Sequence, residues 1–307
     1  MSKQPIAELF GFPVDNESTE AERHRENRRC PYNNKIPNCT KDSTTNPLGI
    51  CSIFQGDNLA VICPVRLRQD WLIADHAAAF FFPTGSRWTT LVEVRLKDSH
   101  GGSAGNIDVV LVSYDEHGQI TDFGSLEVQT VYISGYSVRR GYFEPLMANR
   151  AEYLAIDWEA SRRNSPRADY LSSSRKRLAP QLIYKGGILK AWGKKQAVAV
   201  HSAFFNKLPT LPEVPKDKAD IAWFIYDLVH DEQEHRYNLA LTRTVYTEFK
   251  ASLDKITLSE PGPMNGFIGQ LQTKLDAKLG GTGVADLSDA PDALADEPDL
   301  EEELENL

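Results

Sequence analysis

The sequence has no run of about eighteen apolar residues, so no part of it has the length and hydrophobicity that a membrane-spanning helix requires. The first residues, Met1–Phe12, also lack the basic start and the apolar core of a secretion signal. We therefore expect a cytoplasmic protein without a membrane partner. Since that compartment is reducing, its cysteines are expected to be thiols or metal ligands rather than disulfides.

Lysine and arginine are missing from the end of the chain. Ten acidic residues and no basic one lie between Asp286 and Glu305, whereas elsewhere the 34 basic residues face 33 acidic ones. The net charge of −9 therefore belongs to the tail, and the body of the protein is close to neutral. We expect residues 281–307 to form a disordered, solubilising tail; a segment that mimics DNA and inhibits the protein is the alternative.

Basic residues gather in the middle of the chain. Thirteen bases and only five acids lie between Arg139 and Lys195. Such a block in a neutral body is suited to binding phosphates. A solvated helix face is the alternative explanation.

The hydrophobic pattern predicts a mixed α/β fold. Alternating and β-branched runs predict strands over residues 89–96, 107–114, 123–132, 196–205 and 221–229. Apolar residues at helical spacing predict helices over residues 19–29, 144–158 and 180–190, and a late helix with Val245, Phe249 and Leu253 on one face. A basic loop is expected over residues 162–177. We divide the chain into a cysteine-containing segment (1–70), an α/β domain (71–280) and the tail (281–307).

Acidic residues fall at chemically informative positions in the predicted strands. Asp108 lies within an apolar, β-branched run, where a charge is costly unless it is paired, metal-bound or at the strand end. Glu127 and Gln129 alternate with apolar residues and so share one face of the next strand. A hairpin through Glu116–Gln119 would place Asp108 opposite Glu127, and Glu93 could add a third carboxylate. Converging carboxylates favour Mg²⁺, although an exposed pair of acids on strands is the commoner case.

All four cysteines lie within one polar, proline- and asparagine-rich segment: Cys30, Cys39, Cys51 and Cys63. Their spacing does not contain the CxxC pair of a standard zinc finger. Four thiolates in a segment with little core of its own still favour one tetrahedral site for zinc or iron over four unrelated buried thiols.

These features together resemble the NotI/EagI family of type II restriction endonucleases. The resemblance rests on Arg-Cys-Pro-Tyr-Asn-Asn-Lys at residues 29–35, the four spaced cysteines, and Glu93, Asp108, Glu127 and Gln129. It covers roughly residues 23–200; past about Pro209 nothing is assigned. Ile107 stands where the wider nuclease superfamily usually has proline.

The resemblance implies a PD-(D/E)XK nuclease core, a central mixed sheet flanked by helices, with an N-terminal metal-binding segment that contains the four cysteines. It implies that Glu93, Asp108 and Glu127 bind catalytic Mg²⁺, that Gln129 replaces the usual lysine, and that the cysteines bind one structural iron, with zinc as the alternative. It also implies a bacterial homodimer that cuts both strands of a GC-rich palindrome in double-stranded DNA, with a cognate DNA methyltransferase. The candidates for DNA contact are Arg139, Arg140, Arg175, Lys176, Arg177, Lys194 and Lys195.

Two other functions fit the same residues. The chain could be a non-catalytic, metal-stabilised DNA-binding protein whose carboxylates are structural. It could also be another PD-(D/E)XK nuclease, of the repair or structure-specific kind. Discrete Mg²⁺-dependent fragments from a GC-rich plasmid would separate a restriction endonuclease from both.

Overall fold

The computed structural model describes residues 4–33, 37–56, 58–134, 138–158, 166–258 and 261–280. The chain divides into two units, Met1–Leu258 and Ser259–Leu307. The described part of the second unit contains helix α10 (Met264–Gly280). The acidic tail expected at residues 281–307 lies outside the described residues. Among the helices that are described, none combines the length and the apolar character needed to cross a bilayer.

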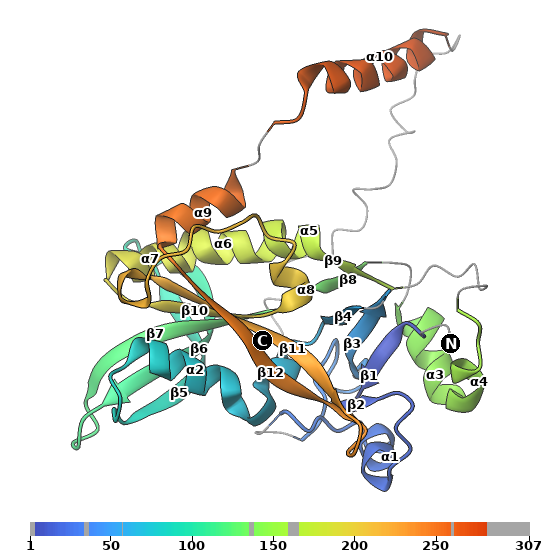
Figure 1. Cartoon of the computed structure of the whole chain (residues 1–307), viewed down its shortest axis with the longest axis horizontal. Coiled ribbons are helices and arrows are strands. Elements are labelled where there is room, and N and C mark those ends of the chain that lie inside the picture. The colour runs from blue at the N-terminus through green and yellow to red at the C-terminus, as the bar shows by residue number, and fades with distance from the viewer. Residues whose placement is uncertain are drawn as a thin grey trace. The chain divides into compact units, whose positions relative to one another are not determined.

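A six-stranded mixed sheet forms the centre of the first unit (Figure 1), in the order β12-β11-β10-β7-β6-β5. β10 runs parallel to both β7 and β11, and the other neighbours are antiparallel. The strands are β5 (Trp88–Lys97), β6 (Ser103–Tyr114), β7 (Ile120–Gln129), β10 (Gln196–His201), β11 (Ile221–Asp231) and β12 (Arg236–Thr247). The expected mixed α/β fold, with a central sheet, is confirmed.

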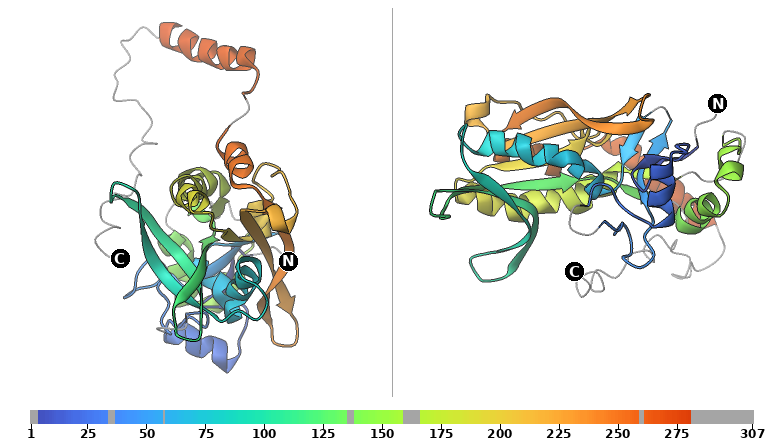
Figure 2. Two further views of the ribbon diagram at one scale, coloured as in Figure 1. Left: turned by 90° about the vertical axis from the view of Figure 1, so that its left-hand side faces the viewer. Right: turned by 90° about the horizontal axis from the view of Figure 1, so that it is seen from below.

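Helices cover both faces of this sheet (Figure 2). Helix α2 (Leu72–Phe81) packs on one face against Leu126, Val128 and the small residues of β10. Gly124 permits this close packing, because a Cβ there would lie 2.6 Å from the Phe81 ring. The opposite face, which carries Val198 and Val200, packs against a long helix. Alternation along β10 therefore divides its side chains between two hydrophobic cores, with Ala197 and Ala199 in one and Val198 and Val200 in the other.

The long helix runs without a break from Tyr170 to Ala191. Its successive parts are α5 (Tyr170–Ser172), the π-helical η3 (Ser173–Leu178), α6 (Ala179–Gln181), the π-helical η4 (Leu182–Gly186) and α7 (Gly187–Ala191). The helix predicted over 180–190 is confirmed, but the predicted basic loop over 162–177 is wrong from Arg167 onward, where a short strand (Arg167–Asp169) leads into the long helix. Leu178 and Leu182 are buried and hold this segment on the sheet.

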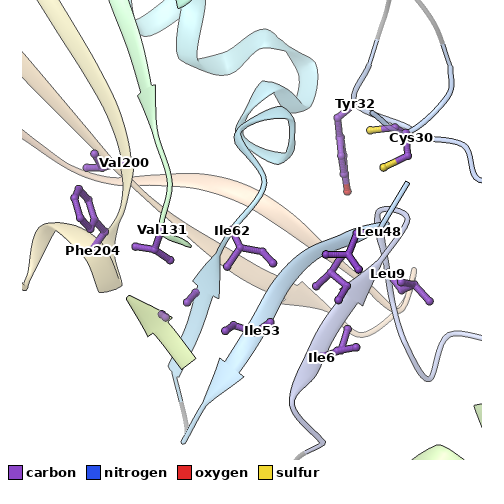
Figure 3. Close-up of a cluster of buried hydrophobic side chains, with 14 of the residues drawn as sticks. Ile6, Leu9, Cys30, Tyr32, Leu48, Ile53, Ile62, Val131, Val200 and Phe204 are labelled. Atoms are coloured by element: carbon purple, nitrogen blue, oxygen red, sulfur yellow. The ribbon is translucent and has the colours of Figure 1, made fainter. Parts of the chain in front are cut away.

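An antiparallel four-stranded sheet, in the order β2-β1-β3-β4, forms the N-terminal part. Its strands are β1 (Ile6–Leu9), β2 (Phe12–Pro13), β3 (Ile50–Gln55) and β4 (Asn58–Val61). Figure 3 shows Ile6 and Ile53 of this sheet in the same buried cluster as Val131, Val200 and Phe204. The N-terminal part therefore shares a core with one face of the central sheet.

Shorter elements complete the unit. They are α1 (Thr19–Glu26), the 3-10 helix η1 (Pro64–Trp71), β8 (Tyr132–Ser134), the π-helical η2 (Arg139–Phe143), α3 (Glu144–Ala148), α4 (Arg150–Leu154), β9 (Arg167–Asp169), α8 (Ser202–Phe205), η5 (Lys216–Lys218) and α9 (Phe249–Thr257).

Three predicted boundaries are wrong. The helix expected over 144–158 is broken at Asn149, whose side chain accepts a hydrogen bond from the Glu152 backbone N–H and so starts a new helix. The strand expected to reach Phe205 ends at His201, which accepts a hydrogen bond from the N–H of Ala203. Val245 lies in β12 rather than in the late helix.

Candidate active site

The pairing of β6 and β7 ends at the two acidic residues. The last aligned pair is Val109 with Leu126, so the next position on each strand is Asp108 and Glu127. Asp108 does not continue the backbone pairing; its Oδ2 accepts a hydrogen bond from the Val128 N–H at 2.8 Å. The hairpin predicted from sequence thus brings the two carboxylates together where the strands separate.

Glu127 and Gln129 lie on the face of β7 that is opposite to Val128. Val128 packs in the core beside helix α2, whereas Glu127 and Gln129 have the same side-chain parity as the strand positions that face the long helix. Only 1 % of Glu127 and 4 % of Gln129 is exposed. Asp108 is half-buried, so the acidic pair lies at the margin of the core rather than in its centre.

A lysine from the long helix completes the site. Lys185 Nζ lies 2.7 Å from Glu127 Oε2 and donates a second hydrogen bond to the backbone carbonyl of Asn106, also at 2.7 Å. Lys185 is 3 % exposed, so this ion pair is buried. The sequence-based selection of site residues missed Lys185, which was counted only as one base of the basic block.

Helical periodicity contains the information that identifies Lys185. Leu178, Leu182, Lys185 and Leu189 follow the spacing i, i+4, i+7 and i+11 of one helix face. The three leucines are buried. A lysine within an apolar stripe is buried only when it is paired, so its position indicates an acidic partner elsewhere in the fold.

The charges of the site do not balance. Burial and, second, the charge of Asp108 raise the pKa of Glu127 to about 8, and Lys185 only partly opposes this rise. Glu127 Oε1 is buried, and no hydrogen-bond donor within the described residues reaches it. Such an oxygen is costly to bury unless a partner is supplied. The site therefore has the donor atoms and the deficit of positive charge that suit a hard cation.

Glu93 lies in line with the other two acidic residues across three strands. Val92 pairs with Val109 and Val94 with Ile107, which leaves Glu93 opposite Asp108. Glu93 has a left-handed backbone, with φ of 56°, and its side chain is exposed. It shares the register position of the acidic pair, but within the described residues it forms no hydrogen bond or ion pair with Glu127 or Lys185.

Gln129 is occupied by a local hydrogen bond. Its Nε2 donates to the carbonyl of the next residue, Thr130, at 2.6 Å. As a neutral amide it adds no positive charge to the acidic pair. Lys185 is the cation that contacts Glu127 in this structure.

The four cysteines are buried and free. Burial, followed by the charges of Cys63 and Cys39, raises the pKa of the Cys30 thiol to about 12. Burial also raises the pKa of Cys51, with further contributions from Cys63, Cys30 and Cys39. In Figure 3 Cys30 lies beside Tyr32 at the edge of the N-terminal sheet. Within the described residues, however, no group of three or more His, Cys, Asp or Glu side chains has a geometry that could hold a metal ion.

The basic candidates fall into two groups. Arg139 pairs with Asp42 at 2.6 Å, Lys194 pairs with Asp122 at 2.6 Å, and Lys195 donates to the Phe80 carbonyl at 3.2 Å. The remaining candidates are exposed: Arg140, Arg175, Lys176 and Arg177. Of these, the Arg177 guanidinium stacks 3.9 Å from the centre of the Tyr132 ring.

Fold and site together define a class of protein. A mixed six-stranded sheet flanked by helices, with acidic side chains where two of its strands separate, is consistent with a nuclease core. The family model described as Restriction endonuclease NotI matches residues 16–239, more than two thirds of the chain. This chain belongs to the NotI restriction endonuclease family, and DNA is therefore its partner. No curated protein matches the chain.

Proposed function

We propose that this protein is a Mg²⁺-dependent type II restriction endonuclease that hydrolyses both strands of double-stranded DNA at a GC-rich palindrome. The observation that carries the proposal is the convergence of Asp108 and Glu127 where β6 and β7 separate. A buried, uncompensated carboxylate oxygen at that point suits a divalent cation. The site would belong to the PD-(D/E)XK type, with Gln129 at the position of its usual lysine.

Three carboxylates are the candidates for holding Mg²⁺: Glu93, Asp108 and Glu127. Bound among them, Mg²⁺ would supply a Lewis acid that activates water and neutralises charge on the phosphate. Asp108 is already oriented by the Val128 N–H, which holds its Oδ2. Glu127 is oriented in the same way by Lys185, which holds its Oε2 and leaves Oε1 without a donor among the described residues.

The long helix offers phosphate contacts. Arg175 and Lys176 are exposed and, within the described part of the chain, form no hydrogen bond or ion pair. They are therefore free to neutralise backbone phosphates, the sequence-independent part of DNA affinity. We propose that a homodimer binds the two halves of the palindrome, because a twofold protein matches a twofold site. A cognate methyltransferase would protect the same sequence in the host.

The four cysteines would hold one structural metal ion, iron or, alternatively, zinc. Four buried thiols without a disulfide match the donor set of a tetrahedral sulfur site. Elemental analysis of the purified protein should give about one iron or zinc per chain. A preparation without either metal would overturn this part of the proposal.

Plasmid cleavage tests the nuclease directly. Incubation of a GC-rich plasmid with Mg²⁺ should give discrete fragments with fixed ends. Asp108→Asn should abolish these fragments while retaining specific DNA binding in Ca²⁺, because the amide oxygen can still accept from Val128 but no longer carries charge. Glu116→Gln is the control, since Glu116 is exposed at the hairpin tip, and it should cut normally.

The outcomes separate the candidate functions. Specific binding without any cutting by the wild-type protein would favour a non-catalytic DNA-binding protein. Cutting that depends on DNA structure, without fixed fragment ends, would favour a repair-type nuclease. Normal cutting by Asp108→Asn would place the active site elsewhere.

A further inference from the structure

Glu127 receives positive charge from the long helix rather than from its own strand. Gln129, two residues along the same face of β7, is neutral and is bonded to Thr130. Lys185 Nζ instead reaches Glu127 Oε2 at 2.7 Å. We propose that Lys185 is a positioning residue of the active site: it holds one oxygen of Glu127 and presents the other to the catalytic cation. This inference rests on the proposed nuclease function and assigns a further residue to it.

The local structure directs Lys185 onto the sheet. Lys185 lies in the π-helical turn Leu182–Gly186, and single π turns occur often at functional sites. The lysine stem lies beside Gly105 of β6, where a Cβ would make an ordinary van der Waals contact with Lys185 Cδ at 3.9 Å. Gly186 allows the helix to approach closely, because a Cβ there would meet the Phe249 ring at 2.7 Å.

A purely structural role explains less of the geometry. A buried ion pair stabilises a protein little, and apolar residues of similar volume often replace such a pair without loss. The apolar stripe of Leu178, Leu182 and Leu189 would accept an apolar residue at position 185 once Glu127 is replaced as well. The presence of the ion pair is explained if the charge of Lys185 acts on Glu127, whose other oxygen has no donor among the described residues.

The reach of Lys185 also fixes the orientation of Glu127. The ammonium is held on two sides, by Oε2 of Glu127 and by the carbonyl of Asn106. Because Asn106 belongs to β6, this second bond ties the ammonium to the strand that carries Asp108. A single cation thus couples both acid-bearing strands and keeps the carboxylates from moving apart as their charges repel.

The test compares cation binding with cutting in Lys185→Met. The substitution removes a positive charge next to the site of the cation. Mn²⁺ binding, followed by electron paramagnetic resonance, should therefore be at least as tight as in the wild type. Single-turnover cutting at saturating Mg²⁺ should nevertheless fall about 100-fold, because Glu127 is no longer oriented. Lys250→Met is the control, since Lys250 is exposed on α9, and it should match the wild type in both measurements.

The double variant Gln129→Lys/Lys185→Met returns a lysine to strand β7. If Lys185 acts through its charge beside Glu127, adding Gln129→Lys to Lys185→Met should raise the cutting rate at least about tenfold over that of Lys185→Met alone. If Lys185 only stabilised the fold, a lysine at position 129 would not compensate for its loss. No recovery, together with equal losses of Mn²⁺ affinity, melting temperature and cutting in Lys185→Met, would overturn the proposal.

Two further results are informative. If Lys185→Met cuts DNA as fast as the wild type, the proposal is overturned. If it also binds Mn²⁺ more tightly, Lys185 only occupies the cation site while the metal is absent. If Lys185→Met does not fold, Lys185→Arg is the alternative variant, because arginine keeps the charge but places it differently. We expect slower cutting with unchanged Mn²⁺ binding. Cutting at the wild-type rate would again overturn the inference. Absence of cutting by the wild type is a distinct failure, that of the proposed function.

Discussion

Two buried carboxylates of this protein differ in how completely their oxygens are satisfied. Both oxygens of Glu8 accept hydrogen bonds, from Arg66 Nε at 2.9 and 3.1 Å and from Ser52 Oγ at 2.7 Å. Glu127 has one oxygen bonded to Lys185 and one without a donor among the described residues. The first arrangement is complete in itself, whereas the second has a place for another cation. This contrast is the basis for treating Glu8–Arg66 as a structural ion pair and for proposing a functional role for Glu127–Lys185.

The Glu8–Arg66 pair should be critical for stability. Arg66→Met leaves Glu8 buried without its cation and also removes the hydrogen bond from Arg66 to the Tyr237 carbonyl. We expect a loss of about 3–5 kcal/mol in the free energy of unfolding, measured by urea denaturation. Arg243→Met, which breaks an exposed pair with Glu213, should cost less than about 1 kcal/mol. Equal losses in the two variants would contradict this assignment.

His201 should make the protein sensitive to acid. Burial lowers the pKa of His201 to about 4, and the nearby Arg66 acts in the same direction, while Asp227 opposes the shift. The unfolded chain, with an ordinary histidine pKa of about 6.5, therefore takes up a proton first. The contribution of His201 to stability is present above pH 6.5 and is lost as the pH falls towards about 4.

Unfolding by urea at a series of pH values measures this effect. The urea concentration at the midpoint of unfolding should decrease for the wild type as the pH is lowered from 6.5 to 4. In His201→Gln this decrease should be smaller. His100→Gln replaces an exposed histidine and should leave the pH dependence unchanged. If His201→Gln shows the same pH dependence of unfolding as the wild type, His201 is not the cause of the acid sensitivity.

At the scale of elements, two adjacent glycines of the long helix have opposite roles. A Cβ at Gly186 would lie 2.7 Å from the Phe249 ring and 2.9 Å from Gln196 Oε1, whereas a Cβ at Gly187 would meet nothing within 4 Å. Gly186→Ala should lower the free energy of unfolding by about 1–3 kcal/mol through overpacking. Gly187→Ala should leave it unchanged or raise it by up to about 1 kcal/mol, because alanine favours helix. Thermal melting of both variants tests the close contact; equal effects would argue against it.

The sequence predicts the strands of the central sheet better than its helices. Alternation and β-branching place β5, β6, β7, β10 and β11 within a few residues, because these strands pack one or both faces on a core. The start of the long helix is missed because Arg175, Lys176 and Arg177 resemble a solvated loop. The chain becomes helical there because Leu178 and Leu182 pack on the sheet, which is a tertiary effect.

The acidic half of the site is also predictable, and the basic half is not. Asp108 and Glu127 belong to one hairpin, so local spacing and the turn between them place both side chains together. Lys185 reaches them only through the fold, from the long helix that lies in the connection between the parallel strands β7 and β10. Its place in an apolar stripe indicates burial, but no local pattern identifies which carboxylate it meets.

At the scale of the whole molecule, the cysteine segment supports the active-site strand. The N–H of Val131, two residues beyond β7, donates to the carbonyl of Val61 at 3.3 Å, and Val61 lies two residues before Cys63. If the cysteines hold a metal ion, Cys39→Ser should lower the melting temperature and the metal content together. Thr44→Ala, an exposed substitution in the same segment, should change neither. Unaltered melting of Cys39→Ser would argue against a metal that stabilises the fold.

The sequence separation of 58 positions between Glu127 and Lys185 has a consequence for folding order. The hairpin that carries the acidic pair is made of neighbouring strands and can form early, whereas the contact with Lys185 must wait until the chain has folded back over the sheet. A newly synthesised chain therefore acquires its two carboxylates before the ammonium that holds them. If Lys185 positions Glu127 as proposed, we expect cleavage competence to be one of the last properties that the chain gains, after the central sheet has been covered.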